Sequence, residues 1–340
     1  MAFSSGEYKF RLIGVPALVA GILLFTVSPG GLHSAHGQNL GKNFAKAKEL
    51  SLTEFGWLEG ASDPTEHLTS EPVTCLSDVS AEQETLSNVG AVAFRSPFLF
   101  GGLAARKKLS CHACHQNGGV NPAFFIDGLS DAPGRIDATN AVFSKKLEDN
   151  KFNPIDIPTL YEINNKKAFG TLTSLPTKED FVHHVIETEF DGPVPNQRIF
   201  DGLLAYINRF DDGCKDDSRE RIARAVSRDF EKVISGMKTA QAEWRAGNND
   251  VANFILLSTR HELGTINERY KSLKRAEKSL YKLALRAELI QSRVSNQSDL
   301  SGQDFEQWHK QAAKTLKRLQ KLEKRSYYQP EKLRALIQEE

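Results

Sequence analysis

The sequence predicts an all-α fold with a smaller domain around a Cys-x-x-Cys-His motif and a C-terminal antiparallel helical hairpin or three-helix bundle. Two observations carry this prediction. Apolar residues recur at helical spacing over most of the chain after residue 216. The motif itself lies among interrupted helical segments, without the βαβ pattern of a parallel sheet. A chain of 340 residues with 40% hydrophobic residues has room for about two such domains.

Residues 1–37 are predicted to be a secretory signal peptide. Lys9 and Arg11 give a positive start, residues 12–27 are apolar, and Ala35-His36-Gly37 supplies small residues for cleavage. The apolar run is shorter than the roughly 20 residues that a bilayer-spanning helix needs. We therefore expect cleavage and export to the periplasm or another exported compartment. The alternative is an uncleaved anchor, the one case in which we expect a membrane association.

Residues 38–89 are predicted to form a partly ordered extension that lies over the next domain. Polar residues dominate this segment, and prolines interrupt it. It contains Cys75, and Cys214 follows the next domain. An oxidising compartment would permit these two cysteines to pair and clip the extension to the far end of that domain. The alternative is two unpaired thiols.

The motif Cys111-His112-Ala113-Cys114-His115 organises residues 90–213. In an exported protein this spacing is the attachment signal of a c-type haem. Two thiols separated by two residues can each bond one vinyl group of the same porphyrin, and the next histidine is then the proximal iron ligand. We therefore expect one covalent haem c, with thioethers at Cys111 and Cys114 and His115 on the iron. A zinc site would need a second ligand pair, which is not obvious in the sequence.

The loop after the motif is predicted to surround the proximal side of this haem. We expect the turn at Pro122 to provide a backbone carbonyl that accepts from the ring N–H of His115. The apolar residues Phe124, Phe125 and Ile126 are expected to contact the haem.

Residues 90–210 resemble the haem domains of bacterial cytochrome c peroxidases and related di-haem enzymes. The resemblance rests on Phe94-Arg95-Ser96-Pro97, on the motif with its Pro122 loop, and on Ile157-Pro158-Thr159-Leu160, which is similar to the family's T-P-S-L. Thr177 to Val182 is the counterpart of a T-L-E-E-V helix start, and Gln197 to Phe210 resembles the closing helix of a cytochrome c fold. The resemblance implies an α-helical cytochrome c-like domain.

The chain departs from this family at two places. It has a single C-x-x-C-H motif, so the family's relay between two haems does not carry over. The family's Met-His pair is replaced by Gly170-Thr171. The candidates for the sixth iron ligand are His184, then His183, which points about 100° away on a helix, and Met237. An open site is the remaining alternative.

The identity of the sixth iron ligand would determine the function. A haem with two protein ligands suits single-electron transfer to or from a redox partner protein, which we expect of this chain. An open site would suit a peroxidase-like or small-ligand-activating enzyme, with Glu187, Glu189 or His184 as acid or base. A third alternative is a scaffold subunit of a redox complex. The net charge of +1 argues against nucleic-acid binding.

Residues 214–340 are predicted to form the helical domain. Its helices are expected over residues 216–244, from residue 249 to about 295, and from residue 301 onward. The last two are locally basic, with lysines and arginines such as Lys278, Lys314 and Lys321. These charges are interpreted either as a docking face for an acidic redox partner or an anionic surface, or as an ordinary solvated face. The solvated face is the simpler interpretation.

Overall fold

The computed structural model describes residues 52–58, 64–161, 163–171, 173–210 and 220–338. Over these residues the protein is built from helices, with two short two-stranded sheets, so the predicted all-α class is confirmed. The predicted signal peptide, residues 1–37, lies outside the described residues. None of the described helices combines the length and the hydropathy needed to cross a membrane.

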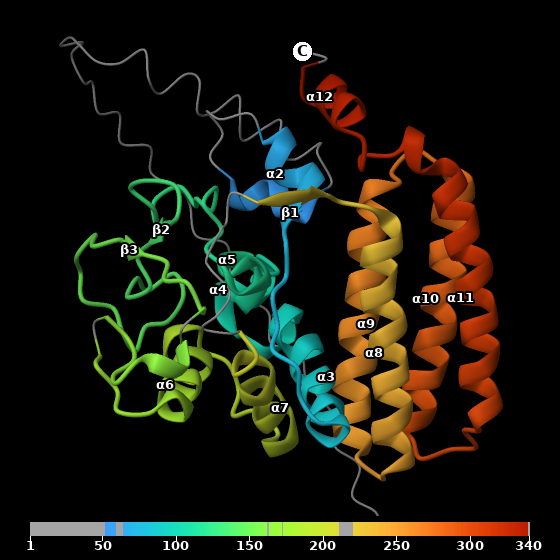
Figure 1. Cartoon of the computed structure of the whole chain (residues 1–340), viewed down its shortest axis with the longest axis horizontal. Helices are drawn as coiled ribbons and strands as arrows, with labels where there is room; N and C mark the ends of the chain where they lie inside the picture. Colours follow the sequence, from blue (N-terminus) through green and yellow to red (C-terminus); the bar gives the residue numbers. More distant parts are fainter. Residues whose placement is uncertain (1–51, 59–63, 162, 172, 211–219, 339–340) are drawn as a thin grey trace, which may run out of the picture. The chain divides into compact units, whose positions relative to one another are not determined.

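Within residues 226–322 four helices form an antiparallel bundle (Figure 1). They are α8 (Val226–Arg245), α9 (Asn249–Arg269), α10 (Lys274–Ser295) and α11 (Gly302–Leu322). Each packs against the next, and α11 also packs against α8, which closes the bundle. The facing sides bury large apolar side chains completely, including Phe230, Ile255, Leu283 and Trp308. Short connections between amphipathic helices account for this arrangement.

The bundle differs from the predicted hairpin or three-helix bundle because the second predicted helix is broken. Helix α9 ends at Arg269, and Ser272 has a φ of 71°, which a right-handed helix cannot include. The Tyr270 hydroxyl donates to the carbonyl of Leu319 at 2.9 Å, so the turn is held against α11. Because Tyr270 and Leu273 continue the apolar stripe, periodicity alone did not show the reversal.

Helices α3 (Ala81–Arg95) and α7 (Gln197–Ile207) frame the motif domain and pack on each other. Helix α3 begins with a capping box in which Ser80 accepts from the backbone of Gln83. At the crossing, a Cβ added to Gly90 would lie 1.8 Å from the carbonyl oxygen of Gly202, so the two backbones touch. Helix α3 also packs on α8 and α9. The domain boundary predicted after residue 89 lies inside this helix.

Residues 96–196, which we call the pocket region, connect α3 to α7 mainly through loops. Their regular elements are short: η2 (Pro97–Leu99), α4 (Gly102–Arg106), α5 (Cys111–Cys114), η3 (Gln116–Gly118), β2 (Arg135–Ile136), β3 (Ile155–Asp156), η4 (Ile163–Asn165), α6 (Lys178–His184) and the π-helical turn η5 (Val185–Glu189). Strands β2 and β3 pair antiparallel.

The described part of the extension contacts both the pocket region and the bundle. It contains η1 (Thr53–Trp57), α2 (Thr65–Thr69) and β1 (Ser70–Pro72). The backbone N–H of Phe125 donates to the carbonyl of Trp57, as expected for a segment lying over the motif domain. On the other side, the N–H of Thr53 donates to Glu268 of α9 at 2.8 Å, and α2 packs on α12 (Pro330–Gln338). The short turn η6 (Glu323–Arg325) precedes α12.

A strand pair and a set of ion pairs attach the extension to the segment that precedes the bundle and to α9. Strand β1 pairs antiparallel with β4 (Arg221–Ala223), which precedes the bundle. Glu54 forms ion pairs with Arg224 and with Arg269, whose guanidinium is buried. Burial raises the pKa of the Glu54 carboxyl, but the two cations outweigh it and lower that pKa to about 2. The predicted Cys75–Cys214 disulfide stays a prediction, because Cys214 lies outside the described residues.

Candidate functional site

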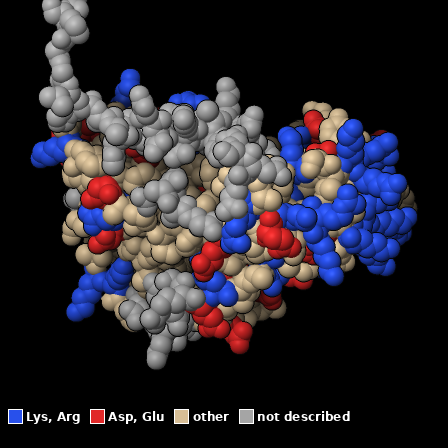
Figure 2. Space-filling view, turned by 90° about the horizontal axis from the view of Figure 1, so that it is seen from above, with Lys and Arg blue, Asp and Glu red and all other residues tan. Residues whose placement is uncertain are grey.

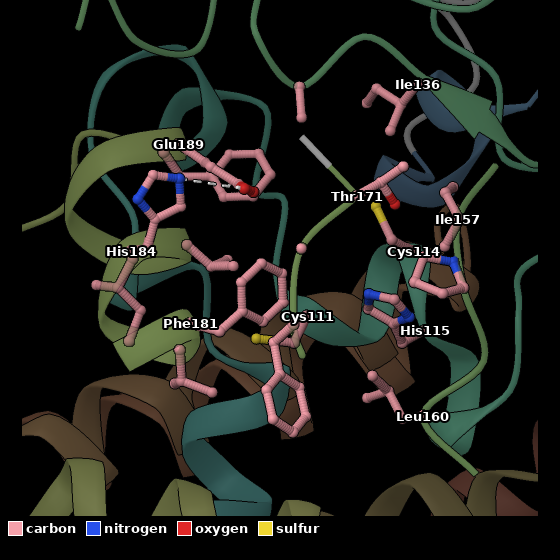
Figure 3. A pocket seen from close by; sticks show the side chains of 18 of the residues that line it. Cys111, Cys114, His115, Ile136, Ile157, Leu160, Thr171, Phe181, His184 and Glu189 are labelled. Atoms are coloured by element: carbon pink, nitrogen blue, oxygen red, sulfur yellow. Dashed lines mark ion pairs between the residues drawn. The ribbon is translucent and has the colours of Figure 1, made fainter. Parts of the chain in front are cut away.

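A cavity of about 620 Å³ lies within the pocket region and against α3 and α7. Its walls are mainly apolar and include five phenylalanines: Phe94, Phe100, Phe169, Phe181 and Phe190. The volume is in the range of pockets that enclose small molecules or cofactors. Figure 3 shows the side chains that converge on this space.

The Cys-x-x-Cys-His motif forms one wall of the cavity. Cys111 and Cys114 are the ends of the one-turn helix α5, and His115 is its C-terminal cap. All three side chains line the cavity, and Figure 3 shows them along the same side. Both thiols are free. The structure thus brings together the three residues that the sequence analysis assigned to haem attachment.

The loop after the motif fixes α5 from behind. The N–H of Asn121 donates to the carbonyl of Cys114, and the Asn121 side chain donates to that of Ala113, each at 2.9 Å. These bonds satisfy carbonyls that the end of a short helix leaves free. Gly118 has a φ of 93° and lies so close to Phe210 that an added Cβ would clash. The chain can therefore turn sharply after His115.

His115 presents an uncharged imidazole to the cavity. Burial lowers the pKa of its ring to about 4, while the adjacent carbonyl of Pro158 opposes this shift. The buried Nδ1 of His115 forms no hydrogen bond. The carbonyl beside the ring thus comes from Pro158, and the prediction that the Pro122 turn provides it is wrong. The reason is that the segment after β3 folds back over the motif, with the N–H of Leu160 donating to the carbonyl of Gly118.

His112, inside the same motif, points away from this cavity. Its Nδ1 accepts from the backbone N–H of Asn117 at 3.3 Å. Its ring lines a separate cavity of about 50 Å³ with Arg224 and Lys232. Burial, followed by those nearby cations, lowers the pKa of His112 to about 3. The two histidines of the motif are therefore not equivalent.

Across the cavity from the motif lie His184 and Glu189, which the sequence analysis named as candidates (Figure 3). Their Nε2 and Oε1 atoms are 3.6 Å apart. The Nε2 atom is buried and has no hydrogen bond. Burial lowers the pKa of His184 and raises that of Glu189 to about 7. An apolar cavity thus holds a histidine and a glutamate, and its burial of both side chains favours their uncharged forms.

The π-helical turn explains why both side chains reach the cavity. Helix α6 ends at His184, and Val185–Glu189 continues as a wider turn. An α-helix would place residues five apart about 140° from one another. The wider turn brings Glu189 back toward His184. Such turns inside helices are rare and often occur at functional sites.

The other candidates of the sequence analysis lie elsewhere. His183 stacks on Phe200, with ring centroids 3.7 Å apart, and its Nδ1 bonds to Glu187 at 2.8 Å. Met237 is completely buried in α8, within the bundle. Neither of these candidate ligands lines the cavity, whereas Gly170 and Thr171 do.

The structure also corrects the prediction that the apolar residues after Pro122 line the haem site. Phe124 is fully buried and, like Phe125 and Ile126, does not line the cavity. The backbone N–H of Phe125 donates to the carbonyl of Trp57, so residues 124–126 face the extension. The walls come instead from phenylalanines distant in sequence from the motif, such as Phe100 and Phe181. No local sequence pattern marks these residues.

The cysteine chemistry differs from that of a redox-active pair. Burial raises the pKa of the Cys111 thiol to about 12 and that of Cys114 as well. Catalytic Cys-x-x-Cys pairs have the opposite shift, because their thiolate is the reactive form. Among the described residues, no group of three or more His, Cys, Asp or Glu side chains is placed to hold a metal ion by itself.

The fold and site define an all-α protein in which a motif-bearing pocket packs beside a four-helix bundle. Comparison of the chain with protein-family models, with curated proteins and with solved structures finds no match.

Proposed function

We propose that this protein is an exported mono-haem c-type cytochrome that carries single electrons to or from a partner protein. The observation that supports it is the shared wall: Cys111, Cys114 and His115 line one side of a cavity of about 620 Å³. Two thiols and one imidazole on a single face are the donor set that a covalent haem requires. The resemblance of residues 90–210 to cytochrome c peroxidases points the same way.

The properties of these residues fit the group. His115 is uncharged, as a ligating imidazole must be. The apolar walls suit a flat hydrophobic cofactor and keep water from it. When bound, the haem supplies a one-electron iron couple. The protein's part is to hold it by Cys111 and Cys114, to orient His115, and to exclude water.

His184 is the residue best suited to the sixth coordination position. Its Nε2 is buried without a hydrogen bond, a costly arrangement unless the atom binds something in the cavity. It lies across the cavity from His115, so the two imidazoles would hold the group from opposite sides (Figure 3). With His115 and His184 both holding the group, little would need to move when its charge changes, which favours electron transfer.

A second function, peroxidase-like catalysis, is favoured by one specific observation. The carboxyl of Glu189 lies within the cavity, 3.6 Å from His184 Nε2. In this reading the sixth position is open, and His184 and Glu189 act on a bound small molecule as base and acid. Glu187 is not available for that role because His183 holds it outside the cavity.

Haem content tests the proposal directly. The chain is produced in a host able to attach c-type haem and assayed by pyridine haemochrome and intact mass. We expect one haem per chain in the wild type, and no covalent haem after the double substitution Cys111→Ala and Cys114→Ala. A colourless wild-type protein with two alkylatable thiols would overturn the proposal.

Absorption spectra then separate the two functions. For the electron carrier we expect a low-spin spectrum that does not change with peroxide or carbon monoxide. His184→Ala should convert it to a high-spin spectrum that responds to both, while the matched control His183→Ala should leave it unchanged. A wild-type spectrum that is already high-spin, with peroxide turnover lost in Glu189→Gln, would favour the enzyme instead.

A further inference from the structure

The outer side of helices α10 and α11 carries a concentration of positive charge. Residues 271–325 contain fourteen lysines and arginines against six aspartates and glutamates, a net charge of +8. Because the whole chain has a net charge of +1, the remaining residues carry −7. This asymmetry produces an electric field directed from one side of the bundle.

Nine lysines form what we call the basic face. On α11 and the following turn they recur at spacings of three and four residues, which places them on one stripe. Because α10 runs antiparallel to α11, its first lysines lie beside the last ones of α11; Arg318 of α11 donates to Ser279 of α10 at 2.5 Å. Figure 2 shows the resulting cluster of positive side chains at the α10–α11 end. The nine are Lys271, Lys274, Lys278, Lys282, Lys310, Lys314, Lys317, Lys321 and Lys324.

These charges are exposed and uncompensated. All nine side chains are exposed, and within the described part of the chain none of them forms an ion pair. The ion pairs that α10 and α11 form involve an arginine and an acidic residue instead of these lysines, such as Arg293 with Asp304. A solvated face normally intersperses both signs of charge.

Large apolar side chains lie among the lysines of α10. Tyr281, Leu285 and Leu289 are 64%, 40% and 62% exposed, and their four-residue spacing puts them on one stripe. This stripe is opposite the buried one, which includes Leu283 and Ile290. Helix α10 is therefore apolar on both sides, which a helix facing only water has no reason to be.

We propose that the basic face binds the anionic surface of a phospholipid bilayer. The lysines would pair with lipid phosphates, while Tyr281, Leu285 and Leu289 would enter the boundary between headgroups and acyl chains. Lysine and exposed leucine and tyrosine on one helix face are the combination that interfacial helices use. The inference is independent of the haem, since it rests on α10 and α11 alone.

The position of the face favours a membrane over an electron-transfer partner. Helix α3, which adjoins the cavity, packs on α8 and α9. A protein docked on the far helices α10 and α11 would be separated from the cavity by the width of the bundle. A surface that tethers the molecule does not need to approach the cavity, so the geometry fits attachment.

Vesicle binding of the purified full chain tests the proposal. The probes are phosphatidylcholine vesicles and vesicles of equal parts phosphatidylcholine and phosphatidylglycerol. We expect sedimentation with the anionic vesicles alone, and release at about 1 M salt, where screening acts within about 3 Å. Reversing three charges, in Lys314→Glu, Lys317→Glu and Lys321→Glu, should lower the partition coefficient at least about a hundredfold.

Two further variants keep the result specific. Leu285→Ser with Leu289→Ser should weaken binding about tenfold without changing its salt dependence. The matched control reverses three exposed lysines away from the face, in Lys107→Glu, Lys145→Glu and Lys151→Glu, and should bind like the wild type. Thermal melts confirm that each variant is folded.

Three outcomes would overturn the inference. They are wild-type protein that ignores anionic vesicles, equal losses in the control and in the face variant, and retention on polyglutamate beads without vesicle binding. The last would assign the face to an acidic protein partner.

Discussion

The pocket region and the four-helix bundle arrange their buried apolar side chains in different ways. In the bundle, residues far apart in sequence fill the interior with their own side chains, and Trp308 and Phe230 are completely buried. In the pocket region, short elements joined by loops surround a cavity of about 620 Å³ with apolar walls. The bundle thus fills its interior with its own side chains, whereas the pocket region keeps a cavity between its apolar walls.

Under the proposed function, the pocket region would depend on its bound group for part of its core, whereas the bundle would not. Each side chain facing an empty cavity loses contacts that it would have in a filled one. The bundle consists of long helices, each packed on the next one in sequence, so we expect it to fold without a bound group. Loops such as those of the pocket region have fewer backbone bonds to hold them. The substitutions below test this division, from the largest expected effect to the smallest.

The largest effect is expected from removing the tethers. Cys111→Ser with Cys114→Ser should leave the bundle folded and open the pocket region. Limited proteolysis followed by mass spectrometry should show cleavage within residues 96–196 faster by about a thousandfold, the effect of losing a tightly bound group. Residues 226–322 should stay protected. Equal loss of protection in both regions would show that the bundle does not fold independently.

The converse substitution damages the bundle. Trp308→Ala removes a buried ring whose Nε1 donates to the carbonyl of Leu283 at 3.2 Å. The free energy of unfolding should fall by about 3–5 kcal/mol, measured by urea denaturation. Haem content per folded chain should not change. The control Tyr281→Ala removes an exposed aromatic from the adjacent helix and should change stability by less than about 0.5 kcal/mol.

Acid should loosen the extension that joins the two regions. The pKa of Glu54 is about 2, below its ordinary value of 4.5. The carboxylate therefore stabilises the fold above pH 4.5, and this contribution is lost as the pH falls toward 2. Its size is about 3 kcal/mol for a shift of this extent. In Glu54→Gln, stability should change less between pH 5 and 2.

The control for Glu54 is Glu231→Gln, which removes an exposed carboxylate from α8. It should keep the wild-type pH dependence in denaturant titrations at each pH. An identical curve for Glu54→Gln and the wild type would show that the ion pairs with Arg224 and Arg269 do not contribute.

The smallest effect concerns the contact between α3 and α7. In Gly90→Ala the new methyl group would meet the backbone of Gly202, which cannot move aside easily. The expected loss is about 1–3 kcal/mol, seen as a lower melting temperature. Gly264→Ala is the matched control, because that helical position has open space and should gain up to about 1 kcal/mol. Equal shifts would mean that the crossing can relax.

The sequence predicted the elements whose information is local. The helical periods around Phe230 and Trp308 gave the all-α class, and the spacing of Cys111, Cys114 and His115 identified one wall of the cavity. The break at Ser272 was missed because a single left-handed residue leaves the apolar stripe intact.

The rest of the cavity depends on distant contacts. Phe181 and Phe190 meet the motif only after the chain has folded, while Phe124, closer in sequence, faces the extension. The sequence ranked His184 above His183 as a candidate ligand, but it did not show what keeps His183 out of the cavity. His183 stacks on Phe200, which belongs to another helix, so only His184 lines the cavity.

The pairing of β1 with β4 has a consequence for the order of events in time. Ser70 cannot meet Ala223 until the ribosome has made about 150 further residues, a delay that chain growth imposes. Every residue of the cavity is synthesised within that interval. The strand pair can therefore close only after every residue that lines the cavity has been synthesised.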